Sequence, residues 1–112
     1  MQILYNNNAD VLLNAHNHRY ERLSRIDPNG IRDDAKGIRT ITAGTGGQPG
    51  DPPNVAPLDI SEKLIFDTPG VIRMDLSGGS YSWKFVAADG TPNGTVMDST
   101  MDTTPTGTES CH

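Results

Sequence analysis

The chain has 112 residues, enough for one small domain, and its 34% apolar content with 12 glycines and 8 prolines predicts a thin core and long loops. Nine basic against 14 acidic side chains give a formal charge of −5, and this balance, with no basic run, argues against nucleic-acid binding. No apolar run approaches the roughly 20 residues that span a bilayer, and the first ten residues lack signal-peptide features. We therefore expect no membrane contact, and the localisation stays unknown.

The first half of the chain predicts one buried strand followed by a long polar loop. Residues 3–5, followed by three asparagines, are typical of the last turn of a helix that begins earlier. The apolar run at residues 11–13 predicts a strand buried on both faces, which usually needs parallel neighbours. Residues 14–26 are polar, and the turn-forming residues 27–30 begin a loop that reaches Lys36.

The second half predicts an antiparallel strand section and a polar tail. Residues 37–43 alternate as a strand does, and the glycines of 44–47 end it. Residues 89–112 are rich in Gly, Thr, Ser, Pro and Asp, a composition that predicts a loosely held tail after a single domain over 1–88. The remaining predictions are an irregular surface loop at 48–57, a short strand at 64–66, and a hairpin of strands 71–76 and 81–85 joined by Gly78-Gly79, with Tyr81, Trp83 and Phe85 in the core.

Two histidines follow the first predicted strand, and they are the candidate metal ligands. His16 and His18 are one residue apart, so both imidazoles can point to the same side of an extended segment. Loops at strand ends are also where open α/β sheets usually place their sites. Taken alone, the His-x-His triplet more often marks exposed or hydrogen-bonded histidines than metal ligands.

The sequence around the histidines adds to this reading. Residues 9–22, Ala-Asp-Val-Leu-Leu-Asn-Ala-His-Asn-His-Arg-Tyr-Glu-Arg, resemble the last metal-binding motif of the calcineurin-like metallophosphoesterases, especially the purple acid phosphatase branch. That motif has an apolar strand, then Gly-His-x-His, then Tyr-Glu-Arg, and Ala15 stands where the motif has glycine. The likeness continues in order with the glycine-rich turn of residues 41–47, the hairpin and a tail that ends in Cys-His.

The resemblance implies an α+β, mostly β fold, the C-terminal part of a metallophosphoesterase sandwich with an antiparallel section and long loops. It implies a metal-dependent phosphoesterase in which His18 binds the first ion, often iron, and His16 the second, divalent ion, with phosphate esters as substrates. The cofactors implied are two transition-metal ions, Fe, Zn or Mn. Next to the histidines, Tyr20, Glu21 and Arg22 could fix the orientation of the ligands by hydrogen bonding, or could form an ordinary ion pair or pack within the loop. Members of the family are often secreted or periplasmic.

Two alternatives stay open, because the aspartates, asparagine, further histidine and tyrosine of the family's other motifs would precede Met1. The chain alone would then bind metal weakly or partially, and it could instead be a non-catalytic, truncated β-rich module that acts through metal or protein binding. A homodimer could pool His16 and His18 from two copies into a four-imidazole site. Carboxylates could lend oxygens or merely form turns and ion pairs: Asp10, Glu21, Asp27, Asp33 and Asp34.

Three further readings have weaker support. Carboxyl-ester cleavage by a single metal-bound water has no support beyond the histidines themselves. Cys111 and His112 are adjacent near the end of the chain, where no oriented base would activate the thiol. Residues 44–50 fit neither the dinucleotide fingerprint nor the P-loop pattern, so we expect a turn there.

Overall fold

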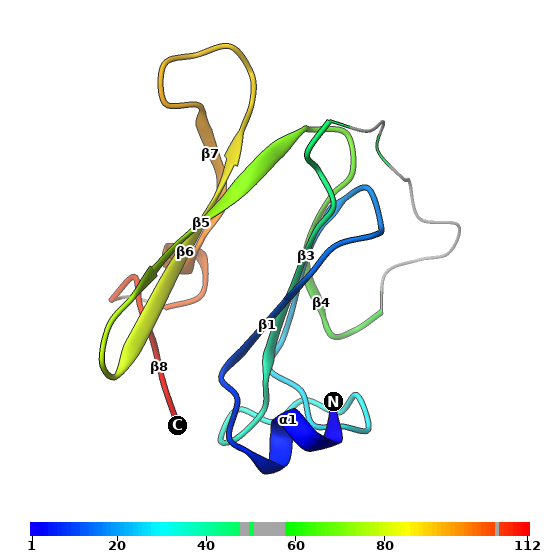
Figure 1. The fold of residues 1–112 in the computed structure, drawn as a ribbon, viewed down its shortest axis with the longest axis vertical. Coiled ribbons are helices and arrows are strands. Elements are labelled where there is room, and N and C mark those ends of the chain that lie inside the picture. The colour runs from blue at the N-terminus through cyan, green and yellow to red at the C-terminus, as the bar shows by residue number, and fades with distance from the viewer. Residues whose placement is uncertain (48–49, 51–57, 105) are drawn as a thin grey trace.

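The computed structural model describes residues 1–47, 50, 58–104 and 106–112, and within them the chain forms two facing β-sheets (Figure 1). This confirms a mostly β fold, with one short α-helix and one 3-10 turn, Thr100–Asp102. None of the helices in the described ranges has the length and apolar character needed to cross a membrane. The elements are α1 (Gln2–Asn6), β1 (Val11–Asn14), β2 (Tyr20–Leu23), β3 (Arg39–Ala43), β4 (Ser61–Ile65), β5 (Gly70–Leu76), β6 (Ser80–Ala87), β7 (Thr95–Ser99) and β8 (Glu109–Ser110).

The first sheet has the strand order β1-β3-β2-β4 and carries the histidine loop. β1 pairs parallel with β3, as the apolar run predicts, with Val11 opposite Arg39 and Leu13 opposite Ile41. The expected burial on both faces is wrong, because β1 lies at the sheet edge and Leu13 is 48% exposed. β2 was not predicted, and it pairs antiparallel with both β3 and β4.

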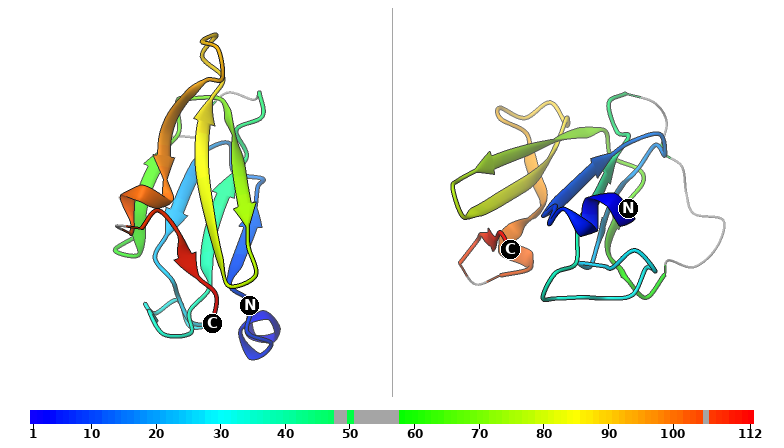
Figure 2. Two further views of the ribbon diagram at one scale, coloured as in Figure 1. Left: turned by 90° about the vertical axis from the view of Figure 1, so that its left-hand side faces the viewer. Right: turned by 60° about the horizontal axis from the view of Figure 1, so that its bottom comes forward.

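The second sheet is built on the predicted hairpin of β5 and β6. Met74 faces Trp83 and Ile72 faces Phe85, while β7 and β8 both pair with β6. Strand β8 continues alongside β6 and ends near the N-terminal end of the chain, so both ends lie at the same end of the sandwich (Figure 2). The hairpin confirms the period-two reading of this part of the sequence.

The core lies between the two sheets. Tyr20, Ile41 and Ile65 of the first sheet meet the predicted aromatic set of β6, and Tyr20 stacks on Phe85 with ring centroids 4.4 Å apart. Alternate residues of each strand point inward, so even β6, the longest strand described, buries only four hydrophobic side chains. The core is correspondingly thin.

Charged groups occupy part of this inter-sheet space. Each of two buried carboxylates accepts hydrogen bonds from one tyrosine and one arginine, and Glu62 contacts both arginines. Buried charges are tolerated when they are paired and hydrogen-bonded in this way. We call this set the polar layer: Tyr20, Arg22, Arg39, Glu62, Tyr81, Asp98 and Glu109.

The polar layer changes the reading of residues 89–112. Composition predicts a loose tail, but Asp98 of β7 is 1% exposed and Glu109 of β8 is 6% exposed. Tyr20 and Tyr81 each donate a 2.6 Å hydrogen bond to one of these carboxylates. The segment is therefore anchored by buried ion pairs rather than by apolar burial, which a composition argument does not detect.

The bounds of two other elements differ slightly from the expected ones. The helix is confined to α1, and the strand expected at 64–66 begins at Ser61 and ends at Ile65. The expected loop 48–57 lies outside the described residues apart from Gly50.

Candidate functional site

The histidine loop, residues 15–19, connects β1 to β2 at the end of the sandwich opposite the chain termini (Figure 1). Thr42 of β3 donates a 2.5 Å hydrogen bond to the Asn14 side chain, so the loop begins from a fixed point on the sheet. His16 has φ +79°, in the left-handed region that costs a non-glycine residue on the order of 1 kcal/mol. Ala15 has no such φ, so the alanine that replaces the motif glycine is accommodated without this strain.

The glycine-rich turn after β3 packs against the backbone of the histidine loop. A Cβ on Gly44 would lie 2.1 Å from the carbonyl oxygen of Asn17, so only glycine allows this approach. The backbone N–H of Gly44 also donates to the carbonyl of Arg19 at 3.2 Å. Turn and loop are thus one packed unit, which gives the predicted glycine-rich turn a physical role.

His16 and His18 line one open pocket of about 560 Å³ together with Ala15, Ala43 and glycines of the turn. His16 is exposed and His18 is half-buried. The loop thus brings both histidines to one pocket, and the expectation that their imidazoles share one side of the loop stays a prediction.

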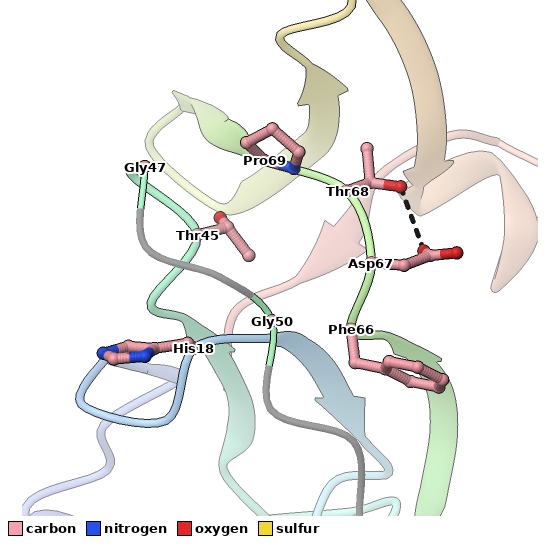
Figure 3. Close-up of a pocket in the computed structure, with 8 residues that line it drawn as sticks. All are labelled: His18, Thr45, Gly47, Gly50, Phe66, Asp67, Thr68 and Pro69. Carbon is pink, nitrogen blue, oxygen red and sulfur yellow. Dashed lines mark hydrogen bonds between the residues drawn. The ribbon is translucent and has the colours of Figure 1, made fainter.

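A second pocket adjoins the first through His18 (Figure 3). Thr45, Asp67 and Thr68 also line it, and Thr68 donates a 3.1 Å hydrogen bond to Asp67. In Figure 3 the His18 ring points away from Asp67. The Asp67 carboxylate is therefore not aimed at the imidazole.

The two metal ions that the resemblance implies need more ligands than the histidine loop supplies. In the described ranges, no three His, Cys, Asp or Glu side chains converge in a way that could hold a metal ion. A zinc-like ion needs about three protein ligands, and the loop supplies two imidazoles. These residues do not complete a dinuclear centre.

The carboxylates that could have lent oxygens have other roles. Asp27 caps a turn by accepting from the backbone N–H groups of Asn29 and Ile31, and Asp33 accepts from Tyr5 and from two backbone N–H groups. Asp34 pairs with Arg32 at the surface. The turn and ion-pair reading of these side chains is confirmed.

Tyr20 and Arg22 point from β2 into the polar layer. Tyr20 is fully buried, and Arg22 binds Asp98 through two nitrogens at 2.8 and 3.1 Å. Burial and the hydrogen bond to Asp98 raise the pKa of Tyr20 well above its usual value, so the hydroxyl stays a donor. This geometry favours packing between the sheets over ligand orientation for both side chains.

Glu21, on the opposite face of β2, lies closer to the histidine loop. It accepts a 2.7 Å hydrogen bond from Ser61 of β4 and lies 3.7 Å from the guanidinium of Arg19, the residue after His18. Of the three residues expected to orient the ligands, Glu21 is the one with an ion pair to the loop itself.

The C-terminal cysteine and histidine do not form a nucleophile pair. The His112 ring nitrogens contact the carbonyl of Gly37 at 3.0 Å and Asp10 at 3.3 Å. Desolvation and the nearby Asp10 carboxylate raise the pKa of the exposed Cys111 thiol, which disfavours the reactive thiolate.

Sequence reasoning missed the polar layer beyond Tyr20 and Arg22. Arg39, Asp98 and Glu109 are far apart in the chain, and no local motif links them. One signal was available: Arg22 and Arg39 lie at inward positions of two neighbouring strands. A buried arginine requires a carboxylate partner.

Comparison with family models, with curated proteins and with solved structures found no match to this chain.

Proposed function

We propose that this chain supplies the two histidine ligands of a metal-dependent phosphoesterase. The observation that carries the proposal is the histidine loop itself: His16 and His18 line one pocket, and His16 takes a strained backbone conformation. Strain of this kind is retained where surrounding structure enforces it, and it is concentrated at functional sites. The motif resemblance of residues 9–22 supplies the reaction class.

The remaining ligands would come from another polypeptide segment, which in a preparation of this chain alone is a second copy of the chain, since the described residues provide two imidazoles. Metal ions in such a centre supply charge stabilisation for phosphoryl transfer. In such a centre, this chain would hold the two imidazoles at the edge of one pocket and leave space for the metal ions beside them. Gly46 and Gly47 provide that space, because a Cβ on either would meet nothing within 4 Å.

The test is hydrolysis of a chromogenic phosphate monoester by the 112-residue chain with added Mn²⁺, Zn²⁺ or Fe²⁺. The expected result is metal-dependent turnover that falls to background in the double variant His16→Ala/His18→Ala. His112→Gln is the matched control, because this third histidine lies away from the loop and contacts Gly37. Equal turnover in the wild type and the double variant would refute the proposal.

The ligand shortfall favours a second function, a non-catalytic module that acts through metal or protein binding. Metal that binds the folded chain must stabilise it, by about 2.7 kcal/mol at a concentration 100 times its Kd. A melting temperature that rises with Zn²⁺ or Mn²⁺ in the absence of any turnover would support metal binding without catalysis. An unchanged melting temperature would leave protein contacts as the remaining function of such a module.

A further inference from the structure

We propose that two copies of this chain pair through β1, so that their first sheets join edge to edge into one continuous sheet. The interaction surface is the outer edge of β1, and the partner is β1 of a second copy, which runs antiparallel to it about a two-fold axis. This inference uses neither the histidines nor the proposed function.

The first argument is the direction of the backbone groups of β1. Val11 lies opposite Arg39 in the parallel pairing with β3, and the Arg39 N–H donates to the carbonyl of Asp10 at 3.0 Å. In such a ladder the residues on either side of Val11 bond to β3, so the N–H and C=O groups of Val11 and Leu13 point away from it. In the left view of Figure 2, β1 forms the outer edge of its sheet, and no strand of the described ranges pairs with that side.

The second argument is that β1 lacks the features that usually protect a sheet edge. Charged residues, irregular pairing and short length all discourage an edge strand from pairing with another chain. β4 carries Glu62 and Lys63, and its pairing with β2 is irregular. β5 carries Arg73 and Asp75, the pairing of β7 with β6 is irregular, and β8 has only 2 residues. β1 is Val-Leu-Leu-Asn, uncharged and in regular register, so its edge is the one most open to pairing.

The third argument identifies the partner as a second copy. Val11 and Leu13, the residues with outward backbone groups, are spaced evenly about Leu12. A two-fold axis at Leu12 places Val11 of each copy opposite Leu13 of the other as hydrogen-bonded pairs, so the outward groups of both strands are satisfied. In this register Asp10 faces the neutral amide of Asn14, so no like charges meet along the joined strands.

The fourth argument is the apolar surface beside the edge. Val11 packs against the core between the sheets, and Leu13 lines a groove between β1 and β5 with Val71 and Ile72. Leu13 is 48% exposed and Val71 is 62% exposed. In the paired register Val11 of one copy lies beside Leu13 of the other, and the two copies of Leu12 meet across the axis on the outer face. Association therefore removes apolar surface from water.

The interface is small, so the dimer is weak. A strand of 4 residues from each copy buries less than the roughly 800 Å² per partner of a standard stable interface. We expect a Kd between about 1 µM and 1 mM. Each copy has a formal charge of −5, so association should strengthen as added salt screens the repulsion.

The dimer and the phosphoesterase are separate proposals. Because the paired strands run antiparallel, the histidine loops of the two copies lie toward opposite ends of the joined sheet. Pairing through β1 therefore neither supplies the missing metal ligands nor depends on them, and the dimer is tested in the presence of EDTA.

The first experiment uses sedimentation velocity of the full chain from about 10 µM to about 2 mM. The expected mass rises with concentration from 12.0 kDa toward twice that value. Amide hydrogen exchange should slow with concentration at Val11 and Leu13, because their N–H groups become bonded only in the dimer. A chain that stays at 12.0 kDa throughout, or a dimer that leaves the exchange of these two amides unchanged, overturns the proposal.

A pair of lysine variants locates the contact. Leu13→Lys should raise the Kd at least tenfold, because the ammonium would lie against Val11 of the second copy. Leu76→Lys is the matched control, since Leu76 is 75% exposed on β5 and the variant adds the same charge away from β1. Its Kd should stay within about twofold of the wild type. Far-UV circular dichroism verifies folding, and equal Kd values in the two folded variants contradict the assignment to β1.

Cysteine cross-linking tests the register in a Cys111→Ser background, which removes the native thiol. Leu12→Cys should form a disulfide-linked dimer with oxidised glutathione, because directly opposite side chains of two antiparallel strands come within disulfide reach. Asn14→Cys is the control, because in this register it lies opposite Asp10 and not opposite its own copy. A folded Leu12→Cys chain that does not cross-link, or cross-links no faster than Asn14→Cys, overturns the proposed pairing.

Discussion

At the scale of single residues, Gly44 packs directly against the backbone of the histidine loop. Gly44→Ala would place a Cβ 2.1 Å from the Asn17 carbonyl, so the loop must shift. We expect a loss of about 1–3 kcal/mol in the free energy of unfolding, the usual cost of overpacking, together with weaker Zn²⁺ binding. Urea denaturation and calorimetric titration measure the two effects.

Gly46→Ala is the matched control for this substitution. Gly46 lies two residues further along the same turn, its φ is not in the left-handed region, and its Cβ would meet nothing within 4 Å. Its unfolding free energy should change by no more than about 0.5 kcal/mol. Similar losses in the two variants would contradict the role given to the Gly44 contact.

Asp98 is the residue that fixes β7 to the first sheet. Asp98→Asn removes the charge that pairs with Arg22, and breaking a buried ion pair costs about 3–5 kcal/mol. Because Glu62 still contacts Arg22, we expect the lower end of that range in urea denaturation. Asp75→Asn, which removes an exposed pair with Arg73, should cost about 1 kcal/mol or less.

A smaller loss at Asp98 than at Asp75 would mean that the polar layer does not hold the sheets together. The comparison is informative because both variants replace a carboxylate that pairs with one arginine. The Asp98 side chain is 0% exposed and also accepts from Tyr20, whereas that of Asp75 is 53% exposed.

At the scale of elements, the strands that the sequence predicted are those with apolar residues facing the core. β3, β5 and β6 alternate between inward apolar and outward polar residues over much of their length, and β1 carries a compact apolar run. The two histidines were also found at this level, because a strand followed by a polar loop is a local pattern. That they line one pocket follows from the local backbone.

The strands that sequence reasoning missed place charged residues toward the core. β2 turns Arg22 inward, and β7 buries Asp98 while Val96 is 50% exposed. Their inward charges are stabilised by partners that lie 76 residues apart in the chain. A hydrophobic pattern contains no information about such pairing, so these strands appear only when the fold is complete.

At the scale of the whole molecule, the polar layer makes stability depend on pH. Burial alone would raise the pKa values of Asp98 and Glu109, but hydrogen bonds from Arg22, Arg39 and the two tyrosines outweigh it and hold both pKa values below their usual range. A carboxylate with a lowered folded pKa binds protons more weakly when folded. Its stabilisation is therefore present above the unfolded pKa, about 4, and is lost as pH falls through the folded pKa.

We therefore expect the free energy of unfolding to be level near neutral pH and to fall as the pH drops below about 4. Urea denaturation at intervals between pH 7 and pH 2.5 measures this profile. In Asp98→Asn one of the two buried carboxylates no longer titrates, so the acid-side decline should become shallower even though the variant is less stable at neutral pH. Asp75→Asn should keep the wild-type slope, and an unchanged slope in Asp98→Asn would show that exposed carboxylates control the acid unfolding.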